Sequence, residues 1–170
     1  MNRLLNMCKV GFVYNFEYVD RFGRVKWSER LTNLIPNAGL TYIVNAAMAG
    51  GSQYDTWYIG LSGTSYTPVA GETMATLLTN APEFTNYSNA ARVTLVPDVV
   101  SDGLYVNAGT PAEFTFTGTG SIALGFLSSN SVKLSTGGLL ISAVQFPSPR
   151  VIEEVGDKLR VIAGIELTAA

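Results

Sequence analysis

The second half of the sequence consists of short segments in which apolar and polar residues alternate, and this alternation constrains the fold most strongly. A period of two is typical of a β-strand with one buried face. Glycine-containing turns separate these segments about every 10–15 residues, as in antiparallel sandwiches, and no βαβ rhythm indicates a parallel sheet. We therefore expect an all-β fold, a jelly-roll-like antiparallel β-sandwich with an N-terminal hairpin and one or two short helices. The expected later strands are residues 91–96, 104–108, 112–118, 121–127, 137–146 and 158–167.

Residues 11–31 predict the N-terminal β-hairpin. Aromatic side chains occupy every second position of its first strand, Asp20 and Gly23 supply the turn, and Trp27 lies on the return strand. The aromatic face is typical of a core face or of a contact with another subunit, whereas a stacking platform for sugars or bases is less favoured beside Glu17. The candidate interface residues are Phe12, Tyr14, Phe16, Tyr18, Arg21, Arg24 and Trp27.

Residues 37–49 predict a helix that has Asn37 as its N-cap and ends at the pair Gly50-Gly51. The apolar residues of the helix recur at the spacing of one buried face. These residues are Leu40, Ile43, Val44, Ala47 and Met48.

We expect residues 1–10 to form an N-terminal arm and residues 11–170 to form a single sandwich domain.

The segment DTWYIGLSGTSYTPVAGETMATL, residues 55–77, joins an apolar strand to a loop of Gly, Ser, Thr and Pro. Such a loop could cradle a phosphate or a sugar. However, no receiving helix follows as a phosphate loop requires, and Ser62 lacks the flanking glycines of a nucleophile elbow. We expect a core strand, a connecting loop, and one or two helical turns at residues 72–78. The residues expected to define the core are Trp57, Ile59, Leu61, Phe114, Phe116 and Phe126.

The chain has no histidine, and Cys8 is its only cysteine. Histidine-dependent dyads, His-ligated zinc sites and an internal disulfide are thereby excluded, and a Ser-Lys pair stays open without any local motif to support it. Asp98 and Asp102 supply too few oxygen ligands for calcium, and the glycine-rich residues 118–125 lack the helix that a nucleotide loop needs. We expect no enzymatic activity, no catalytic residues, no metal and no cofactor.

The net charge is −2, and charged residues make up only 14% of the chain, whereas soluble domains commonly carry about 25%. With an isoelectric point near 5.1, no direct binding of nucleic acid and no binding to a membrane are expected. No apolar run approaches the ~20 residues of a membrane span, and the first residues do not resemble a signal peptide. Low charge is typical of a protein partly covered by partner subunits.

Seven motifs follow one another along nearly the whole chain, and only their order is specific. In this order they resemble a widespread family of tailed-bacteriophage proteins encoded among the virion structural genes. The chain departs from the family pattern at Glu72, where the family usually has an aspartate. The motifs are DRFGRVKWSERLTNLIPNAGLTYIVNAAMAG, WYIGLSG, GETMA, EFTNYSNAAR, AEFTFTGTGSIALGFLSSNSVK, GGLLISAVQF and VGDKLRV.

The resemblance implies a virion structural component. It favours a capsid decoration or cement protein, similar to the jelly-roll cement proteins of short-tailed phages, that binds the outside of the assembled lattice. The implied partners are the major capsid protein and further copies of this chain, as a dimer or trimer. The implied location is the capsid surface of the virion, after synthesis in the host cytoplasm.

Two alternatives stay open. One is a tail, neck or fibre-attachment adaptor, and the other is a carbohydrate-binding sandwich that uses Trp57, Tyr58 and Tyr66. For the favoured function, residues 1–30, the arm with the hairpin, are the expected contact element, because exposed strand edges pair readily with other chains.

Overall fold

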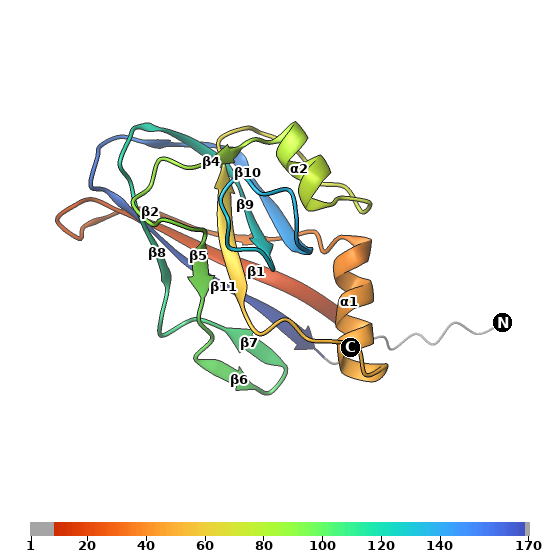
Figure 1. The fold of residues 1–170 in the computed structure, drawn as a ribbon. Helices are drawn as coiled ribbons and strands as arrows, with labels where there is room; N and C mark the ends of the chain where they lie inside the picture. Colours follow the sequence, from red (N-terminus) through yellow and green to blue (C-terminus); the bar gives the residue numbers. More distant parts are fainter. Residues whose placement is uncertain (1–8, 169–170) are drawn as a thin grey trace.

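The computed structural model describes residues 9–168, which form two antiparallel sheets and two short helices (Figure 1). The first sheet has the order β2 (Val25–Thr32), β1 (Lys9–Val19), β11 (Lys158–Thr168), β7 (Leu104–Val106) and β6 (Val99–Ser101), and β8 (Ala112–Thr115) also pairs with β11. The second has the order β10 (Leu140–Ile152), β9 (Gly120–Ser128), β3 (Trp57–Ser62) and β4 (Glu83–Phe84), and β5 (Val93–Leu95) also pairs with β3. The helices are α1 (Asn37–Met48) and α2 (Met74–Asn80). The expected all-β sandwich is confirmed.

The N-terminal hairpin is formed by β1 and β2, which pair antiparallel with Tyr18 opposite Trp27. Its strands run over residues 9–32, slightly beyond the expected 11–31. Of the expected arm, residues 1–8 lie outside the described residues, and residues 9 and 10 already belong to β1. Strand β1 is central in its sheet because β11 pairs along its other edge.

The aromatic face of β1 lies in the core between the two sheets. Phe12, Tyr14, Phe16 and Tyr18 are at most 4% exposed. The hydroxyl group of Tyr14 also forms a hydrogen bond of 2.7 Å with the Ser142 hydroxyl on β10, which links the two sheets. The prediction that these four residues contact another subunit is therefore wrong. The domain itself buries their rings, and each large apolar side chain buried in this way contributes about 1.5–3 kcal/mol to folding.

Helix α1 has nearly the expected bounds, but its contact face differs from the predicted one. Gly39 is its fully buried residue, and a Cβ atom there would lie 2.9 Å from the carbonyl oxygen of Ile141 on β10. The helix therefore packs closely through glycine, which rotates Val44 and Met48 into solvent. The N-cap is Pro36, without a side-chain hydrogen bond, instead of Asn37.

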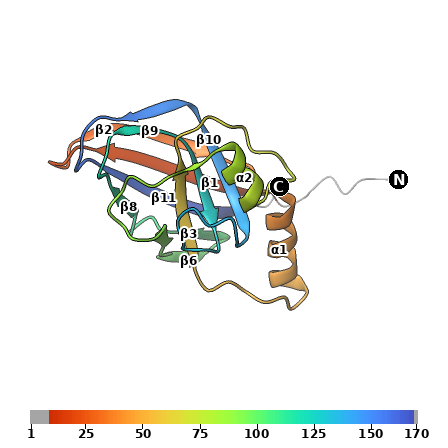
Figure 2. The same ribbon diagram turned by 45° about the horizontal axis from the view of Figure 1, so that its top comes forward.

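The two ends of the sandwich differ in character. The turn of the β1–β2 hairpin projects at one end, whereas α1 lies at the opposite end, beside the start of β1 and the end of β11 (Figures 1 and 2). Helix α2 lies beside the second sheet. Any partner that contacts the hairpin turn thus approaches the end of the molecule away from α1.

Candidate protein-contact site at the hairpin tip

The hairpin tip, residues 20–25, is held in shape by the side chain of Asp20. Its Oδ1 accepts hydrogen bonds from the backbone N–H groups of Phe22 and Arg24, each at 2.9 Å, and its Oδ2 accepts one from Arg24 Nε at 2.6 Å. Burial alone would raise the pKa of Asp20, but these bonds to Arg24 and Phe22 outweigh it and lower the pKa. Gly23 takes the positive φ of 87° that closes the turn.

A second aspartate, Asp157, anchors the tip from the loop between β10 and β11. Its Oδ1 accepts a hydrogen bond of 3.0 Å from the Arg21 backbone N–H, and its Oδ2 accepts bonds from the Tyr18 hydroxyl at 2.6 Å and from Lys26 Nζ at 3.0 Å. Desolvation alone would raise the pKa of Asp157, but these three donors together hold it below its usual range. Two buried aspartates thus fix one short turn.

The fixed turn presents an exposed aromatic ring between two cations. The side chain of Phe22 is 71% exposed, and the guanidinium groups of Arg21 and Arg24 lie 5.1 and 5.6 Å from its ring centroid. Val25 and Val155 are also exposed, each by 56%, and widen the apolar surface. Aromatic residues and arginine are the side chains that most often dominate the binding energy of protein interfaces.

Of the seven interface residues predicted from the sequence, two lie exposed at this tip. Arg21 and Arg24 are exposed, whereas Trp27 is half-buried and stacks on Tyr18 with ring centroids 5.6 Å apart. The sequence-based reasoning missed Phe22, although one signal was present. An aromatic residue inside a tight turn, where polar residues and glycine are the rule, has no packing role that the turn itself requires.

The Trp57–Leu61 strand is a core element and offers no stacking platform. Trp57 is 8% exposed, and the rings of Tyr42 and Tyr54 pack edge-on against it, each with its centroid 5.5 Å away. Ile59, Leu61, Phe114, Phe116 and Phe126 are fully buried. Because Tyr66 is half-buried and donates its hydroxyl to Glu72, the proposed carbohydrate platform of Trp57, Tyr58 and Tyr66 has no exposed tryptophan to build on.

The loop after this strand, residues 63–73, is organised by its own side chains. Glu72 is 2% exposed and accepts hydrogen bonds from the Tyr66 hydroxyl at 2.8 Å and from the Val69 backbone N–H at 3.3 Å. Thr73 then caps α2 in a reciprocal pair with Thr76. Because these hydrogen bonds occupy the Glu72 carboxylate, the loop serves to connect β3 to α2, as expected from the sequence.

Other candidate chemical groups also have structural partners. Asp98 accepts a hydrogen bond from the Gly109 backbone N–H, and Asp102 forms the β6–β7 turn at φ 52°. Ser62 is fully buried and accepts from the Thr64 backbone N–H. In residues 9–168 no three His, Cys, Asp or Glu side chains gather as a metal site requires. A groove of about 500 Å³ on the outer face of the first sheet contains Glu17, which is paired with Arg160.

No family model matches the chain, and no curated protein matches it. The resemblance to bacteriophage virion proteins therefore rests on the ordered sequence motifs alone. Neither helix in residues 9–168 is long and apolar enough to cross a membrane.

Proposed function

We propose that this chain is a bacteriophage virion structural protein, a capsid decoration or cement protein that binds the outside of the assembled major-capsid lattice and stabilises the head. The ordered motifs support the virion assignment. The observation that carries the binding role is the hairpin tip, where a turn fixed by two aspartates exposes Phe22 between Arg21 and Arg24.

The geometry of the tip suits a rigid contact. An exposed Phe ring gains free energy when it enters an apolar pocket. Arg24 is paired with Asp20 and Arg21 with Glu154, but each guanidinium group has further N–H donors for carboxylates at the pocket rim. Because the turn is already held by hydrogen bonds, little conformational entropy is lost on binding. The matching capsid surface would therefore have an apolar pocket bordered by acidic side chains.

The stabilisation of a head follows from mass action. A protein that binds the assembled lattice, and not its separated subunits, shifts the equilibrium towards the closed shell. Many symmetry-related copies multiply a modest contact energy. In this proposal the partners are the major capsid protein and neighbouring copies of the chain, and the location is the capsid surface. A contribution of residues 1–10 to the contact stays a prediction.

The binding test compares two single substitutions in the full chain. Heads that lack the protein are titrated with wild-type protein, Phe22→Ala and Val132→Ala, and bound protein is measured by co-sedimentation. Val132 is 60% exposed outside the tip and serves as the matched control. We expect Phe22→Ala to weaken binding about 30-fold, the effect of losing an interface anchor worth about 2 kcal/mol, and Val132→Ala to bind like wild type.

Equal binding by Phe22→Ala and wild type would show that the tip is not the contact. Absence of any wild-type binding to heads, together with binding to purified tails, would favour the tail or neck adaptor instead. Circular dichroism of all three proteins checks that a lost contact does not reflect a lost fold.

A further inference from the structure

The groove of about 500 Å³ on the outer face of the first sheet is lined by residues of β2, β1 and β11 and by Pro111, which precedes β8. Because alternate side chains of a strand point to opposite faces, the side chains between the buried aromatic residues of β1 lie on this outer face. The antiparallel registers align the groove residues of the three strands in two neighbouring rows. The first row consists of Arg30, Asn15 and Ile162, and the second consists of Ser28, Glu17 and Arg160.

The charged side chains of the second row are paired within the protein. Arg160 Nη1 lies 3.2 Å from a carboxylate oxygen of Glu17, and Arg160 Nε lies 3.3 Å from one of Glu113. Glu29, which also lines the groove, accepts a hydrogen bond of 2.6 Å from Arg150 Nη2. Both carboxylates that line the groove therefore have a cationic partner, and an acidic ligand would meet no unpaired negative charge there.

Three polar side chains of the groove have no such partner. Among residues 9–168, no hydrogen bond and no ion pair involves the side chain of Asn15, Ser28 or Arg30, and all three residues are exposed. The planar guanidinium group of Arg30 suits a carboxylate, with which it can form two parallel hydrogen bonds. Asn15 lies directly opposite Arg30 in the register, where Cβ atoms are about 4.5–5.5 Å apart. One ligand can therefore reach both side chains.

These side chains define the chemistry of a ligand. Arg30 can bind a carboxylate, and Asn15 and Ser28 can donate hydrogen bonds to hydroxyl groups and accept them. Ile162 and Pro111 offer apolar surface to the C–H groups of a ring. A sugar acid, which is a pyranose ring with a carboxylate, combines the three properties, and the groove volume lies within the roughly 300–1,000 Å³ of small-molecule sites.

A peptide strand is a poorer match for the groove. Strand β1, which crosses the groove at Asn15 and Glu17, is paired along both of its edges, with β2 and with β11. Peptides that bind as an added strand need an unpaired edge for their backbone hydrogen bonds. The groove therefore favours a small ligand that is recognised by side chains.

We propose that this groove binds a sugar acid, with Arg30 on its carboxylate and with Asn15 and Ser28 on its hydroxyl groups. The site differs in place and in residues from the tryptophan platform considered from the sequence. It also lies apart from the hairpin tip and makes no use of the capsid assignment, so the two proposals can fail separately.

The binding test titrates ¹⁵N-labelled full-length protein with methyl α-D-galacturonide and, separately, with methyl α-D-galactoside, the neutral sugar of the same ring. The amide signals of Asn15, Ser28, Arg30 and Ile162 report on the groove. We expect saturable shifts of these signals with the galacturonide. The neutral sugar should bind about 10-fold more weakly or less, because it has no carboxylate for charged hydrogen bonds.

Two substitutions test the role of Arg30. Arg30→Gln should weaken binding of the galacturonide about 10-fold or more, because the charged hydrogen bonds are lost. Thr32→Ala is the matched control and should bind like wild type, since Thr32 is exposed on the same strand and face, one row away from the groove. Circular dichroism checks that both variants are folded.

The absence of shifts with the galacturonide would overturn the proposal, as would equal affinity of wild type and Arg30→Gln or of the acidic and neutral sugars. Acetate that binds as tightly as the galacturonide would show a simple anion site instead. A capped acidic tripeptide, acetyl-Gly-Glu-Gly-amide, that shifts the same amide signals at lower concentration would assign the groove to a protein segment and refute the sugar acid.

Discussion

At the scale of single residues, the most constrained polar contact is the ion pair of Glu83 and Arg92, whose side chains are fully buried. Arg92 donates to both carboxylate oxygens, from Nε at 2.9 Å and from Nη2 at 2.8 Å, and its guanidinium group lies 5.2 Å from the ring centroid of Phe126. It also donates to the carbonyl oxygens of Asn130 and Ser135. The pair thus ties the segment before β5 to the loop that follows β9.

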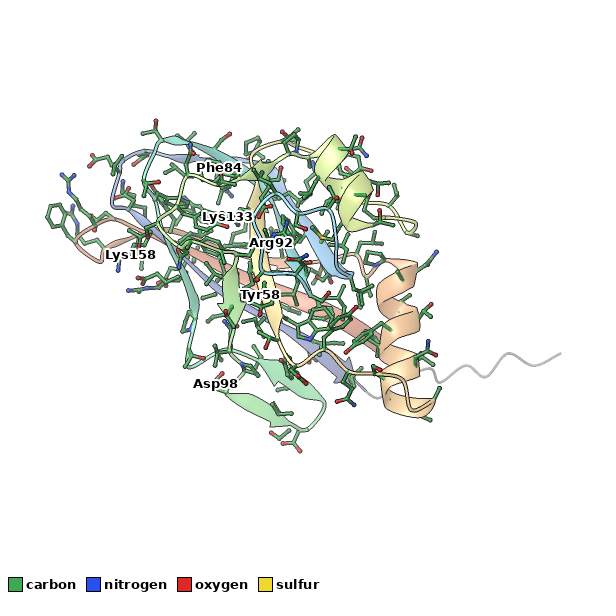
Figure 3. All side chains as sticks on the ribbon, viewed as in Figure 1. Tyr58, Phe84, Arg92, Asp98, Lys133 and Lys158 are labelled. Atoms are coloured by element: carbon green, nitrogen blue, oxygen red, sulfur yellow. The ribbon has the colours of Figure 1, made fainter. Side chains whose placement is uncertain are left out.

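Lys133 reinforces the same loop. Its Nζ lies 3.6 Å from the ring centroid of Tyr87 and donates to the Tyr87 carbonyl oxygen at 3.1 Å. Desolvation outweighs the nearby Glu83 carboxylate and lowers the pKa of Lys133. Figure 3 shows Arg92 and Lys133 among the side chains on this part of the molecule. The loop of residues 129–139 is therefore held by two cations.

We predict that Glu83→Gln destabilises the protein by about 3–5 kcal/mol, because it leaves the buried charge of Arg92 without its counter-ion. Urea unfolding followed by circular dichroism measures the free energy. Glu113→Gln is the matched control, since its ion pair with Lys158 is 36% exposed on both sides and should be worth less than about 1 kcal/mol. Equal losses for the two variants would contradict the account of the buried pair.

The sequence predicted residue burial better than it predicted residue pairing. Period-two alternation placed Phe114 and Phe116 in the core correctly, because strand geometry sends alternate side chains to opposite faces. The pairing of Glu83 with Arg92 could not be predicted, since the sequence shows two charges but no sign that both are buried. The exposed Phe22 was missed although its place inside a tight turn was a signal, because the expected interface followed the alternating aromatic residues of the first strand.

At the scale of elements, helix α1 shows what periodicity can and cannot predict. Its bounds followed from the apolar run and from the glycines after it. The face of α1 that contacts β10 could not be predicted in this way. Either the apolar stripe or the glycine could face β10, and only Gly39 allows the helix backbone to approach β10 so closely. As a result, Leu40, Val44 and Met48 are exposed.

The hairpin is another element whose stability depends on a few charged contacts. Burial first, and then its hydrogen bond to Asp157, raise the pKa of Tyr18 to about 12. Hydrogen bonds to Glu153 and Asp157 raise the pKa of Lys26. The lowered pKa of Asp157 affects stability at acidic pH. The ionised carboxylate stabilises the folded state fully above 3.8, the pKa in the unfolded chain, and this stabilisation is lost as the pH falls through the lower pKa of the folded state.

We predict that Asp157→Asn costs about 2 kcal/mol of unfolding free energy at pH 7, because charged hydrogen bonds to Lys26 and to the hairpin turn are lost. The difference from wild type should shrink as the pH falls below about 4, where the wild-type carboxylate becomes protonated. Urea unfolding at a series of pH values measures it. Asp55→Asn, at an exposed position, is the control and should stay near wild type. A difference that is independent of pH would refute the electrostatic explanation.

At alkaline pH, stability changes with pH in the opposite direction and falls as the pH rises. Because Tyr18 and Lys26 have raised pKa values, the folded state binds more protons than the unfolded state above about pH 10, where free tyrosine and lysine lose theirs. The stability of the hairpin should therefore decline from pH 10 upward.

At the scale of the whole molecule, the sequence predicted the sandwich but not its strand order. Alternation and regularly spaced turns indicate antiparallel strands, and these local signals were sufficient for the fold class. The placement of β11 between β1 and β7 depends on contacts between residues more than 100 positions apart, such as Phe16 with Val161. No local pattern contains that information. The position of the hairpin tip, the proposed contact surface, is a consequence of this arrangement.

The number of copies in each purified virion tests the proposed decoration function most directly. Quantitative gel densitometry of particles, with the major capsid protein as internal standard, gives this number. A decoration protein that follows the capsid lattice should be present in hundreds of copies, in a simple ratio to the capsid subunits. A tail or neck adaptor would form a closed ring of about 3–12 copies, and a copy number in that range would contradict the capsid assignment.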